Sequence, residues 1–335
     1  MSWQWCIAGI FLYMVERIIR EVRGRFETYV SKVVQHPSKV VEIQIKKPSM
    51  RYKPGQYLFF HCPEVSRFEW HPFTISSAPE EDYVSVHVRV VGDFTTALSK
   101  RLGCKFEKDD DSPAPTSLPR VMIDGPFGSA SEDVFKYEVA ILVGAGIGVT
   151  PFSSILKSVW YRVINPNTIM KMRRCFFFWI CRDTNVTHFI PKRPPPYGDT
   201  VFSHSLFFSP LSFLSAQAFE WFQDLLEALE AEDIDNFLEI RMFLTGGLKA
   251  DQVRNVVLNS ADGRDALTGL KSPTYYGRPN FDQMFSQIAQ QHPSTDVGVF
   301  FCGPKPLSHS LHKACNKNTS SIKGGTKFYY HKENF

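Results

Sequence analysis

The sequence predicts two domains of different class, an antiparallel β-barrel followed by an α/β domain built on a parallel sheet. Between residues 26 and 127, short β-type runs are separated by turn residues, which is typical of antiparallel strands. From residue 137 onward, apolar strands alternate with helical segments, which indicates a parallel sheet covered on both faces. The chain has 335 residues, of which 43% are hydrophobic, so it can form two ordinary cores.

The composition excludes several classes of protein. The net charge is +4 and dispersed, so we expect no nucleic-acid partner. The seven cysteines are odd in number and contain no C-x-x-C pair, so we expect neither a disulfide framework nor a metal site, and a reducing compartment fits best. Aromatic residues reach 14%, which suits aromatic cores and stacking on a flat cofactor.

The first 25 residues predict the inner end of a membrane helix. Residues 1–15 carry only Ser2 and Gln4 as polar side chains, but this run is shorter than the roughly 20 apolar residues that span a bilayer. Four arginines follow it, the reverse of a secretory signal peptide: Arg17, Arg20, Arg23 and Arg25. We therefore expect a membrane location with the following domains on the cytoplasmic side; the alternative is an ordinary buried or amphipathic N-terminal helix.

Residues 26–130 are expected to form the barrel. Valines at every second position from Val84 to Val90 indicate a strand with two differently used faces. Residues 109–119, rich in Asp and Pro, predict a solvated loop. The expected strands are Thr28–Val34, Val40–Ile45, Gln56–His61, Tyr83–Val91 and Arg120–Ile123.

Residues 137–335 are expected to form the α/β domain. The predicted strands are Val139–Val143, Cys175–Cys181, Arg241–Thr245 and Val297–Cys302, and the predicted helices are Pro151–Val163, Phe219–Glu230 and Lys305–Cys315. Residues 186–217 do not fit this pattern, because they hold five Pro, five Ser and five Phe but a single acidic residue, Asp199. A structureless insert of this length is unusual inside an α/β unit.

A glycine-rich turn is the strongest local signal. Residues 144–151, Gly-Ala-Gly-Ile-Gly-Val-Thr-Pro, lie between a predicted strand and a predicted helix. Glycines let backbone N–H groups approach a pyrophosphate, and a helix N-terminus adds positive potential. The third glycine comes one residue earlier than G-x-G-x-x-G requires, so the turn is not the ordinary dinucleotide fingerprint, and a purely structural turn is the alternative.

A second group of residues is spaced along the barrel strands. A flat aromatic, a hydroxyl and an arginine at such positions could bind an isoalloxazine, its ring nitrogen and a pyrophosphate. Taken singly, each residue is more often an ordinary barrel side chain. The segments are His71–Ser77, His87–Arg89 and Gly92–Thr96.

Together these motifs resemble a family. Residues 71–74 (His-Pro-Phe-Thr), 144–151 and 302–304 (Cys-Gly-Pro) resemble the ferredoxin–NADP reductase superfamily. Further segments resemble the superoxide-generating NADPH oxidase family within it: residues 124–135, 155–161, 181–184, 277–280 and the terminal Lys-Glu-Asn-Phe. The resemblance covers nearly everything from residue 15 to residue 335 except the insert.

The resemblance implies FAD and NADPH as cofactors. The flavin ring and ribityl chain would be held by His71, Pro72, Phe73 and Thr74, with His87 nearby, and the FAD phosphates would meet Arg89 and Thr95. The NADPH pyrophosphate would lie on Gly144, Gly146, Gly148, Val149 and Thr150, and its other phosphates would meet Arg182 and Arg278. The nicotinamide would lie beside Cys302, Gly303 and Pro304.

The implied activity is that of the dehydrogenase module of a superoxide-generating NADPH oxidase. Hydride would pass from NADPH to FAD, and single electrons would then pass toward membrane haem and oxygen, with cytosolic activator proteins as partners. The residues implied in catalysis are Thr74, Cys302 and the C-terminal Phe335, which would stack over the flavin and be displaced by nicotinamide. A ferric-chelate reductase, or an inactive fragment lacking the haem helices, is the alternative.

Residues 186–217 depart from the family, in which a strand ending like residues 181–184 leads within a few residues into a helix like residues 218–222. Every Val codon begins with GT and one Gln codon is CAG, so a segment from Val186 to Gln217 can carry the boundaries of an intron translated in frame. A genuine surface insertion is the alternative, because loops tolerate extra length at modest entropic cost.

Overall fold

The computed structural model describes residues 3–24, 26–36, 39–106, 117–165, 170–181, 220–231, 237–245 and 270–333. The chain divides into two compact units. Unit 1 comprises residues 1–35, 39–132 and 150–161, and unit 2 comprises residues 36–38, 133–149 and 162–335. The predicted segments 109–116, 186–217 and 334–335 lie outside the described residues.

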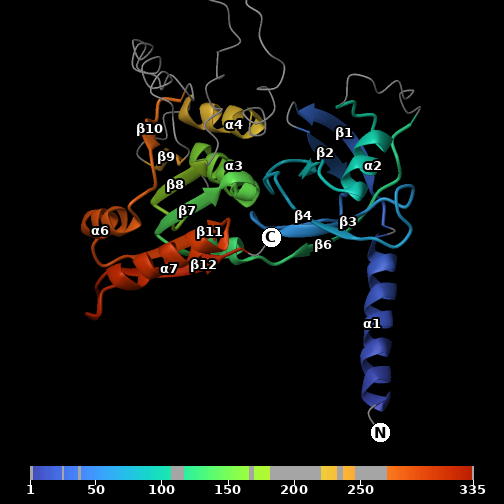
Figure 1. Cartoon of the computed structure of the whole chain (residues 1–335), viewed down its shortest axis with the longest axis horizontal. Helices are drawn as coiled ribbons and strands as arrows, with labels where there is room; N and C mark the ends of the chain where they lie inside the picture. Colours follow the sequence, from blue (N-terminus) through green and yellow to red (C-terminus); the bar gives the residue numbers. More distant parts are fainter. Residues whose placement is uncertain are drawn as a thin grey trace, which may run out of the picture. The chain divides into compact units, whose positions relative to one another are not determined.

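Unit 1 begins with α1 (Trp3–Gly24), a helix of 22 residues (Figure 1). Its first half is apolar, and Ile10, Phe11 and Leu12 are more than 60% exposed. Its second half is basic and is anchored to the barrel: Arg23 Nε lies 3.1 Å from a carboxylate oxygen of Asp124, which is 1% exposed. None of the helices among the described residues is both long and apolar enough to cross a membrane.

Six antiparallel strands of unit 1 form two sheets. The first sheet has the order β1-β2-β5, with β1 (Tyr29–His36), β2 (Val40–Lys46) and β5 (Val84–Arg89). The second has the order β4-β3-β6, with β4 (His71–Thr74), β3 (Tyr57–His61) and β6 (Met122–Phe127). An antiparallel bridge between Ile75 and Val86 links them. The sheets enclose an apolar core that includes Ile43, Leu58, Phe60, Val86 and Ile123, all fully buried.

Two helices complete unit 1. Helix α2 (Asp93–Arg101) follows β5, and its Leu98 enters the core. Most of α3 (Thr150–Ile164) is also grouped with the barrel rather than with the sheet that precedes it. One face of α3 is buried and carries three serines among its apolar residues: Ser153, Ser154 and Ser158.

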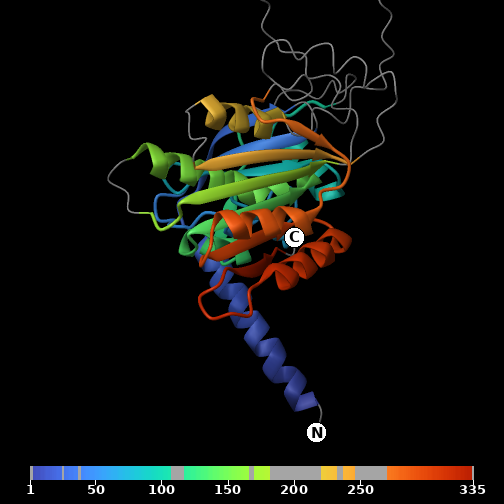
Figure 2. The same ribbon diagram turned by 90° about the vertical axis from the view of Figure 1, so that its left-hand side faces the viewer.

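Unit 2 is built on a six-stranded parallel sheet of order β10-β9-β8-β7-β11-β12 (Figures 1 and 2). The strands are β7 (Val139–Ala145), β8 (Arg174–Cys181), β9 (Leu238–Leu244), β10 (Thr274–Tyr276), β11 (Asp296–Cys302) and β12 (Lys327–Lys332). The central strands β7, β8 and β11 are almost continuously apolar, as expected for strands buried on both faces.

Helices cover both faces of this sheet. Helices α6 (Phe281–Gln291) and α7 (Lys305–Asn318) pack on the face that carries Ile141 and Phe176. Side chains alternate along a strand, so Phe177 and Trp179 point to the opposite face, where they contact Phe222 of α4 (Glu220–Ala231). Two short 3-10 helices, η1 (Ala130–Lys136) and η2 (Gly146–Val149), flank β7.

The predicted fold class is confirmed, and the differences have physical causes. Strand β4 was not predicted, because a proline argues against a strand. Pro72 is tolerated there because β4 lies at the edge of its sheet. Helix α2, helix α6 and strand β12 were also missed, since each is short and mixes polar with apolar residues.

Candidate functional site

In unit 2, the glycine-rich turn and the Cys-Gly-Pro turn lie side by side. Strands β7 and β11 are parallel neighbours, and their register pairs Gly144 with Cys302. A Cβ atom added to Gly148 would lie 2.3 Å from the carbonyl oxygen of Cys302, and one added to Gly303 would lie 2.7 Å from the Cβ atom of Ala145. Gly148 therefore allows the two backbones to approach closely, and Gly303 leaves room for the Ala145 side chain.

Backbone conformation adds a further requirement. Gly146 has φ +56°, in the left-handed region that residues with a side chain rarely adopt. Space around its missing Cβ is open, with no atom within 4 Å. The turn thus leaves open space beside Gly146, shortly before the N-terminus of α3 at Thr150. That is the geometry with which helix N-termini bind phosphate groups.

The order of the strands places this turn where parallel sheets bind ligands. From β7 the chain builds outward through β8, β9 and β10, and it then returns to the other side of β7 with β11 and β12. The reversal falls between β7 and β11, at the carboxyl ends that carry Gly144 and Cys302. Ligands of open α/β sheets bind in the crevice at such a switch point.

Cys302 is buried at this point, with 5% exposure. Burial raises the pKa of its thiol to about 12, and the carboxylate of Glu333 acts in the same direction. The thiol is therefore protonated at neutral pH and is suited to packing against a ring rather than to nucleophilic attack. Glu333 is held nearby, because its backbone N–H donates to the Phe301 carbonyl at 2.8 Å.

The other predicted nucleotide residues are more dispersed. Arg278 is exposed and follows the carboxyl end of β10. Strand β10 is three strands from β7, and because the sheet is parallel, Arg278 lies on the same side as the carboxyl end of β7. Neighbouring strands are ~4.8 Å apart, so this separation is on the scale of a dinucleotide rather than of one phosphate. Arg182 and Phe335 lie outside the described residues.

In unit 1, the predicted flavin residues lie on β4 and on the start of α2. Within β4, Pro72 is exposed and its three neighbours are half-buried. The His71 ring stacks on Phe94 of α2 with centroids 3.8 Å apart, and Phe73 meets the core ring of Phe60 edge-on. Thr74 ends the strand, paired with Tyr57 of β3. The strand thus presents polar and aromatic groups at an edge with open backbone.

Arg89 and the first turn of α2 form a second part of the flavin side. Arg89 ends β5, is exposed, and forms no ion pair with the described carboxylates. The hydroxyl of Thr95 accepts hydrogen bonds from the N–H groups of Val91 and Gly92, at 3.1 and 3.0 Å, and so caps the helix. An exposed guanidinium beside a helix N-terminus fits a pyrophosphate, with Thr95 shaping the turn that supplies the N–H groups.

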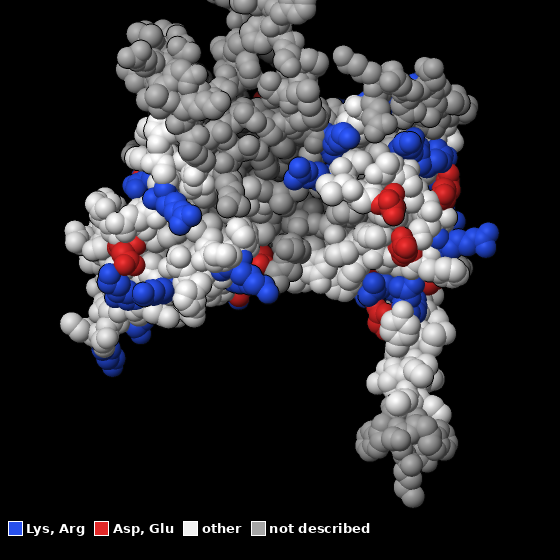
Figure 3. Space-filling model, in the orientation of Figure 1, with Lys and Arg blue, Asp and Glu red and all other residues white. Residues whose placement is uncertain are grey.

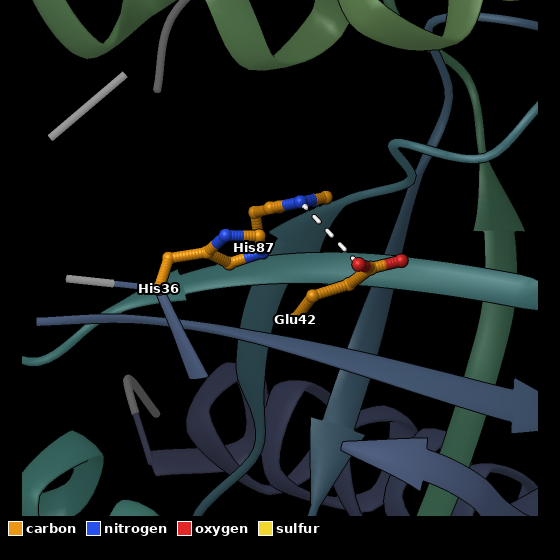
Figure 4. Close-up of side chains that lie close together, drawn as sticks. All are labelled: His36, Glu42 and His87. Carbon is orange, nitrogen blue, oxygen red and sulfur yellow. Dashed lines mark ion pairs between the residues drawn. The ribbon is translucent and has the colours of Figure 1, made fainter. Parts of the chain in front are cut away.

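His87 is occupied inside the barrel. Its Nδ1 atom lies 2.7 Å from Ser76 Oγ, and its Nε2 atom lies 4.0 Å from a carboxylate oxygen of Glu42. Figure 4 shows this imidazole and Glu42 on adjacent strands, together with His36, the last residue of β1 in the same sheet. The His87 side chain is only 5% exposed, so its place in flavin binding remains a prediction.

A buried network of hydroxyl groups was not predicted from the sequence. Two serines of α3 donate to the segment that follows β4: Ser153 Oγ to the Ser76 carbonyl at 3.1 Å and Ser154 Oγ to the Ser77 carbonyl at 2.6 Å. Both donors are fully buried. The helix that follows the glycine-rich turn is thus bonded to residues two and three positions after Thr74. The signal available in the sequence was a pair of serines on the apolar face of a helix.

The network continues through Glu80 and Glu81. Ser158 Oγ donates to a carboxylate oxygen of Glu80 at 2.8 Å, and Lys157 Nζ lies 3.4 Å from Glu81. The Tyr52 hydroxyl donates to the Ala78 carbonyl at 2.7 Å, and burial raises its pKa well above the usual range. Residues 76–81 are therefore held on several sides, which fixes the end of β4 in position.

Comparison with known proteins agrees with this geometry. An FAD-binding domain model matches residues 25–131, and a ferric reductase NAD binding domain model matches residues 137–191 and 211–316. The unmatched stretch, residues 192–210, falls inside the segment that departs from the α/β pattern. NADPH oxidase 3 of Homo sapiens is 43% identical over 338 residues, covering 100% of this chain and 53% of that protein.

The chain is homologous to the FAD- and NADPH-binding dehydrogenase region of NADPH oxidases. A second relative, a superoxide-generating NADPH oxidase heavy chain of Dictyostelium discoideum, is 43% identical over 340 residues and covers 99% of this chain and 59% of that protein. The chain thus spans about half the length of the curated relatives it matches, and it corresponds to their FAD- and NADPH-binding dehydrogenase region.

The fold has a counterpart among solved structures. A ferredoxin NADP+ reductase from Neisseria gonorrhoeae with bound FAD and NADP matches 91% of this chain and 98% of that chain, with a TM-score of 0.51 and 13% identity. At this identity the likeness shows the fold alone. The fold is therefore that of a ferredoxin NADP+ reductase, and the predicted resemblance to the NADPH oxidases is confirmed by the relatives above, whereas the individual site residues remain predictions.

Proposed function

We propose that this chain is the dehydrogenase module of a superoxide-generating NADPH oxidase. When bound, NADPH supplies a hydride that FAD accepts, and FAD then releases electrons one at a time toward membrane haem and oxygen. The observation that carries the proposal is the close approach of Gly148 to the Cys302 carbonyl at the switch point of the parallel sheet. It supports a dinucleotide site built from the two predicted turns.

The residues of unit 2 would bind and orient NADPH. The backbone from Gly144 to Thr150 would hold the pyrophosphate, and Arg278 would pair with a phosphate at the adenosine end, together with Arg182. Cys302, Gly303 and Pro304 would form a surface for the nicotinamide. The protonated Cys302 thiol suits this role, since it presents sulfur without charge to an uncharged ring face.

The residues of unit 1 would hold FAD. His71, Pro72, Phe73 and Thr74 would line the isoalloxazine and ribityl chain, and Arg89 with the first turn of α2 would hold the pyrophosphate. Phe335 would cover the flavin until nicotinamide displaces it. We also propose the domain boundaries. Residues 1–25 would be the end of a membrane helix, residues 26–130 the flavin domain and residues 137–335 the nucleotide domain.

The whole assembly would be a membrane protein with both domains on the cytoplasmic side. Oxygen would be the final electron acceptor, and cytosolic proteins would activate the assembly. The exposed apolar side chains of α1, followed by its arginines, support this placement because basic flanks mark the cytoplasmic end of membrane helices.

The test is anaerobic reduction of the flavin. The full chain is loaded with FAD, and flavin absorbance is followed after addition of NADPH or NADH. We expect rapid bleaching by NADPH and slow bleaching by NADH. Flavin that is bound but not bleached by either nucleotide contradicts the proposal for this polypeptide.

A second variant tests the departure at residues 186–217. We propose that this stretch is a translated intron, and deletion of it joins the strand that ends at Cys181 to α4 as in the family. Faster bleaching by NADPH in the deletion variant than in the full chain supports this origin. Transcripts that cross these codons without a gap in most messages contradict it and favour a genuine insertion.

A further inference from the structure

A cavity opens in unit 1 where α1 meets the barrel. Its volume is about 450 Å³, and its lining includes Glu21 of α1 and, from the barrel, His61, Arg67, Phe68 and Arg120. Neither the flavin residues nor the nucleotide residues described above line it. The sequence did not predict it, because its walls come from four separate segments of the chain.

Among the charged side chains that line the cavity, two are positive, Arg67 and Arg120, and one is negative, Glu21. Arg67 and Arg120 are both exposed, and neither guanidinium pairs with a carboxylate among the residues that the structure describes. Arg120 is positioned through its backbone, whose N–H donates to Glu64 at 3.1 Å, while Glu64 itself pairs with Arg101. Figure 3 shows Lys and Arg side chains, with acidic side chains beside them, where α1 meets the barrel.

The inner wall of the cavity is rigid. His61 is 3% exposed, stacks on Trp70 with centroids 4.9 Å apart, and places Nδ1 2.8 Å from the Glu69 carbonyl. On the other side, α1 is held to the barrel by Arg20, whose guanidinium lies 4.2 Å from the centre of the Phe59 ring, and by the Arg23–Asp124 pair. These contacts therefore fix the position of α1 relative to the barrel wall.

One aromatic residue of the lining, Phe68, is strongly exposed. Phe68 is 78% exposed, and its carbonyl accepts a hydrogen bond from Arg17 of α1 at 3.0 Å. Leu12 is 67% exposed and precedes Glu21 by nine residues, which corresponds to ~13 Å along the helix. An exposed aromatic and two exposed guanidinium groups thus line the cavity, and exposed apolar side chains of α1 lie within about 13 Å of it along the helix, which is the scale that separates lipid headgroups from acyl chains.

We propose that this cavity binds the phosphate headgroup of an anionic phospholipid, with Arg67 and Arg120 as its ligands. The proposal rests on the proposed function in one respect, that α1 is the inner end of a membrane helix. A guanidinium donates two parallel hydrogen bonds to phosphate oxygens, so two of them can hold one headgroup without any further cation. Phe68 would lie among the first acyl carbons, where aromatic side chains are favoured.

The test measures headgroup preference in the full chain. The protein in neutral detergent micelles receives phosphatidic acid or phosphatidylcholine with the same pyrene-labelled acyl chains, and energy transfer from tryptophan to pyrene reports binding. We expect the native chain to prefer phosphatidic acid. Replacement of both arginines, Arg67→Gln with Arg120→Gln, should reduce that preference by about thirtyfold.

The matched control removes two other exposed arginines, Arg51→Gln with Arg173→Gln, and should keep the preference of the native chain. Equal loss in both double variants overturns the proposal, because the effect is then one of net charge. Glycerol 3-phosphate in excess should leave the energy transfer unchanged; displacement by it overturns the lipid assignment in favour of a water-soluble phosphate.

Flavin reduction measured on the same samples separates this proposal from the proposed function. Both double variants should bind FAD and be bleached by NADPH at the native rate, since none of the four arginines lies among the cofactor residues. Loss of bleaching with intact lipid preference contradicts the proposed function alone. Intact bleaching without lipid preference in the native chain contradicts the lipid site alone.

Discussion

The two cofactor surfaces that we propose are built from different kinds of residue. In unit 2, the nucleotide turns are defined by the absence of side chains, since Gly148 and Gly303 sit where a single added carbon meets the neighbouring turn. In unit 1, the proposed flavin surface is defined by side chains, including Arg89 and the stacked pair His71 and Phe94. A single substitution in the first surface should therefore cause a large loss of activity, whereas single substitutions in the second should each cause a smaller loss of binding.

The largest effect is expected for Gly148→Ala. The new Cβ atom would lie 2.3 Å from the Cys302 carbonyl oxygen, so one of the two turns must move. A displacement of about 1 Å at a reacting site costs on the order of a hundredfold in rate, and we expect that loss in NADPH-driven flavin reduction while FAD remains bound. Gly9→Ala, with no atom within 4 Å, is the control and should change nothing.

Arg89→Gln should weaken FAD binding by about tenfold to a hundredfold, because charge-assisted hydrogen bonds to phosphate contribute ~1.5 to 3 kcal/mol. FAD affinity can be measured by equilibrium dialysis. The control is Arg51→Gln, another exposed arginine of unit 1. If Arg89→Gln binds FAD as tightly as the control does, the flavin phosphates lie elsewhere and the comparison of the two surfaces fails.

Ser154→Ala tests whether the hydroxyl network supports the flavin surface from behind. It removes the 2.6 Å bond to the Ser77 carbonyl, and we expect the free energy of unfolding to fall by ~1 kcal/mol in urea titrations. Ser310→Ala, on the exposed face of α7, removes a longer hydroxyl-to-carbonyl bond of 3.3 Å at the surface and should cost less. Equal losses would show that burial adds nothing to this bond.

The smallest effect concerns pH. Burial lowers the pKa of His331, although the nearby carboxylates of Asp133 and Glu333 oppose the shift. The folded state therefore favours the neutral ring, so this stability is present above the ordinary pKa of about 6.5 and is lost as the pH falls below it. His331→Gln, which can still bond the Tyr137 hydroxyl, should flatten the fall of the melting temperature in acid. If the melting temperature falls with decreasing pH as steeply in the variant as in the native chain, groups other than His331 cause the fall.

The sequence was sufficient for features that depend on periodicity or on one compact motif. Strands such as β7 and β11 were predicted within two residues of their bounds because they are apolar throughout, and the turn at Gly144 was placed correctly between a strand and a helix. Strand β4 was missed because the sheet order that makes Pro72 acceptable is not a local property.

Contacts between distant segments were beyond such reasoning. The bonds from Ser153 and Ser154 to residues 76 and 77 join positions separated by 77 residues, and a serine on an apolar helix face does not name its partner. The cavity beside Arg67 and Arg120 likewise exists because a loop, two strand ends and α1 come together. Resemblance to a family could supply the roles of residues that match its motifs, but not these contacts.

The burial of the cysteines bears on durability under oxidative stress. Six of the seven are buried, and burial raises the pKa of Cys62, Cys104, Cys175, Cys302 and Cys315. Oxidants attack the thiolate rather than the thiol. These side chains should therefore remain reduced thiols and resist conversion to sulfenic acid. A module proposed to supply electrons for superoxide formation would thereby protect its own cysteines from the oxidants that form from superoxide.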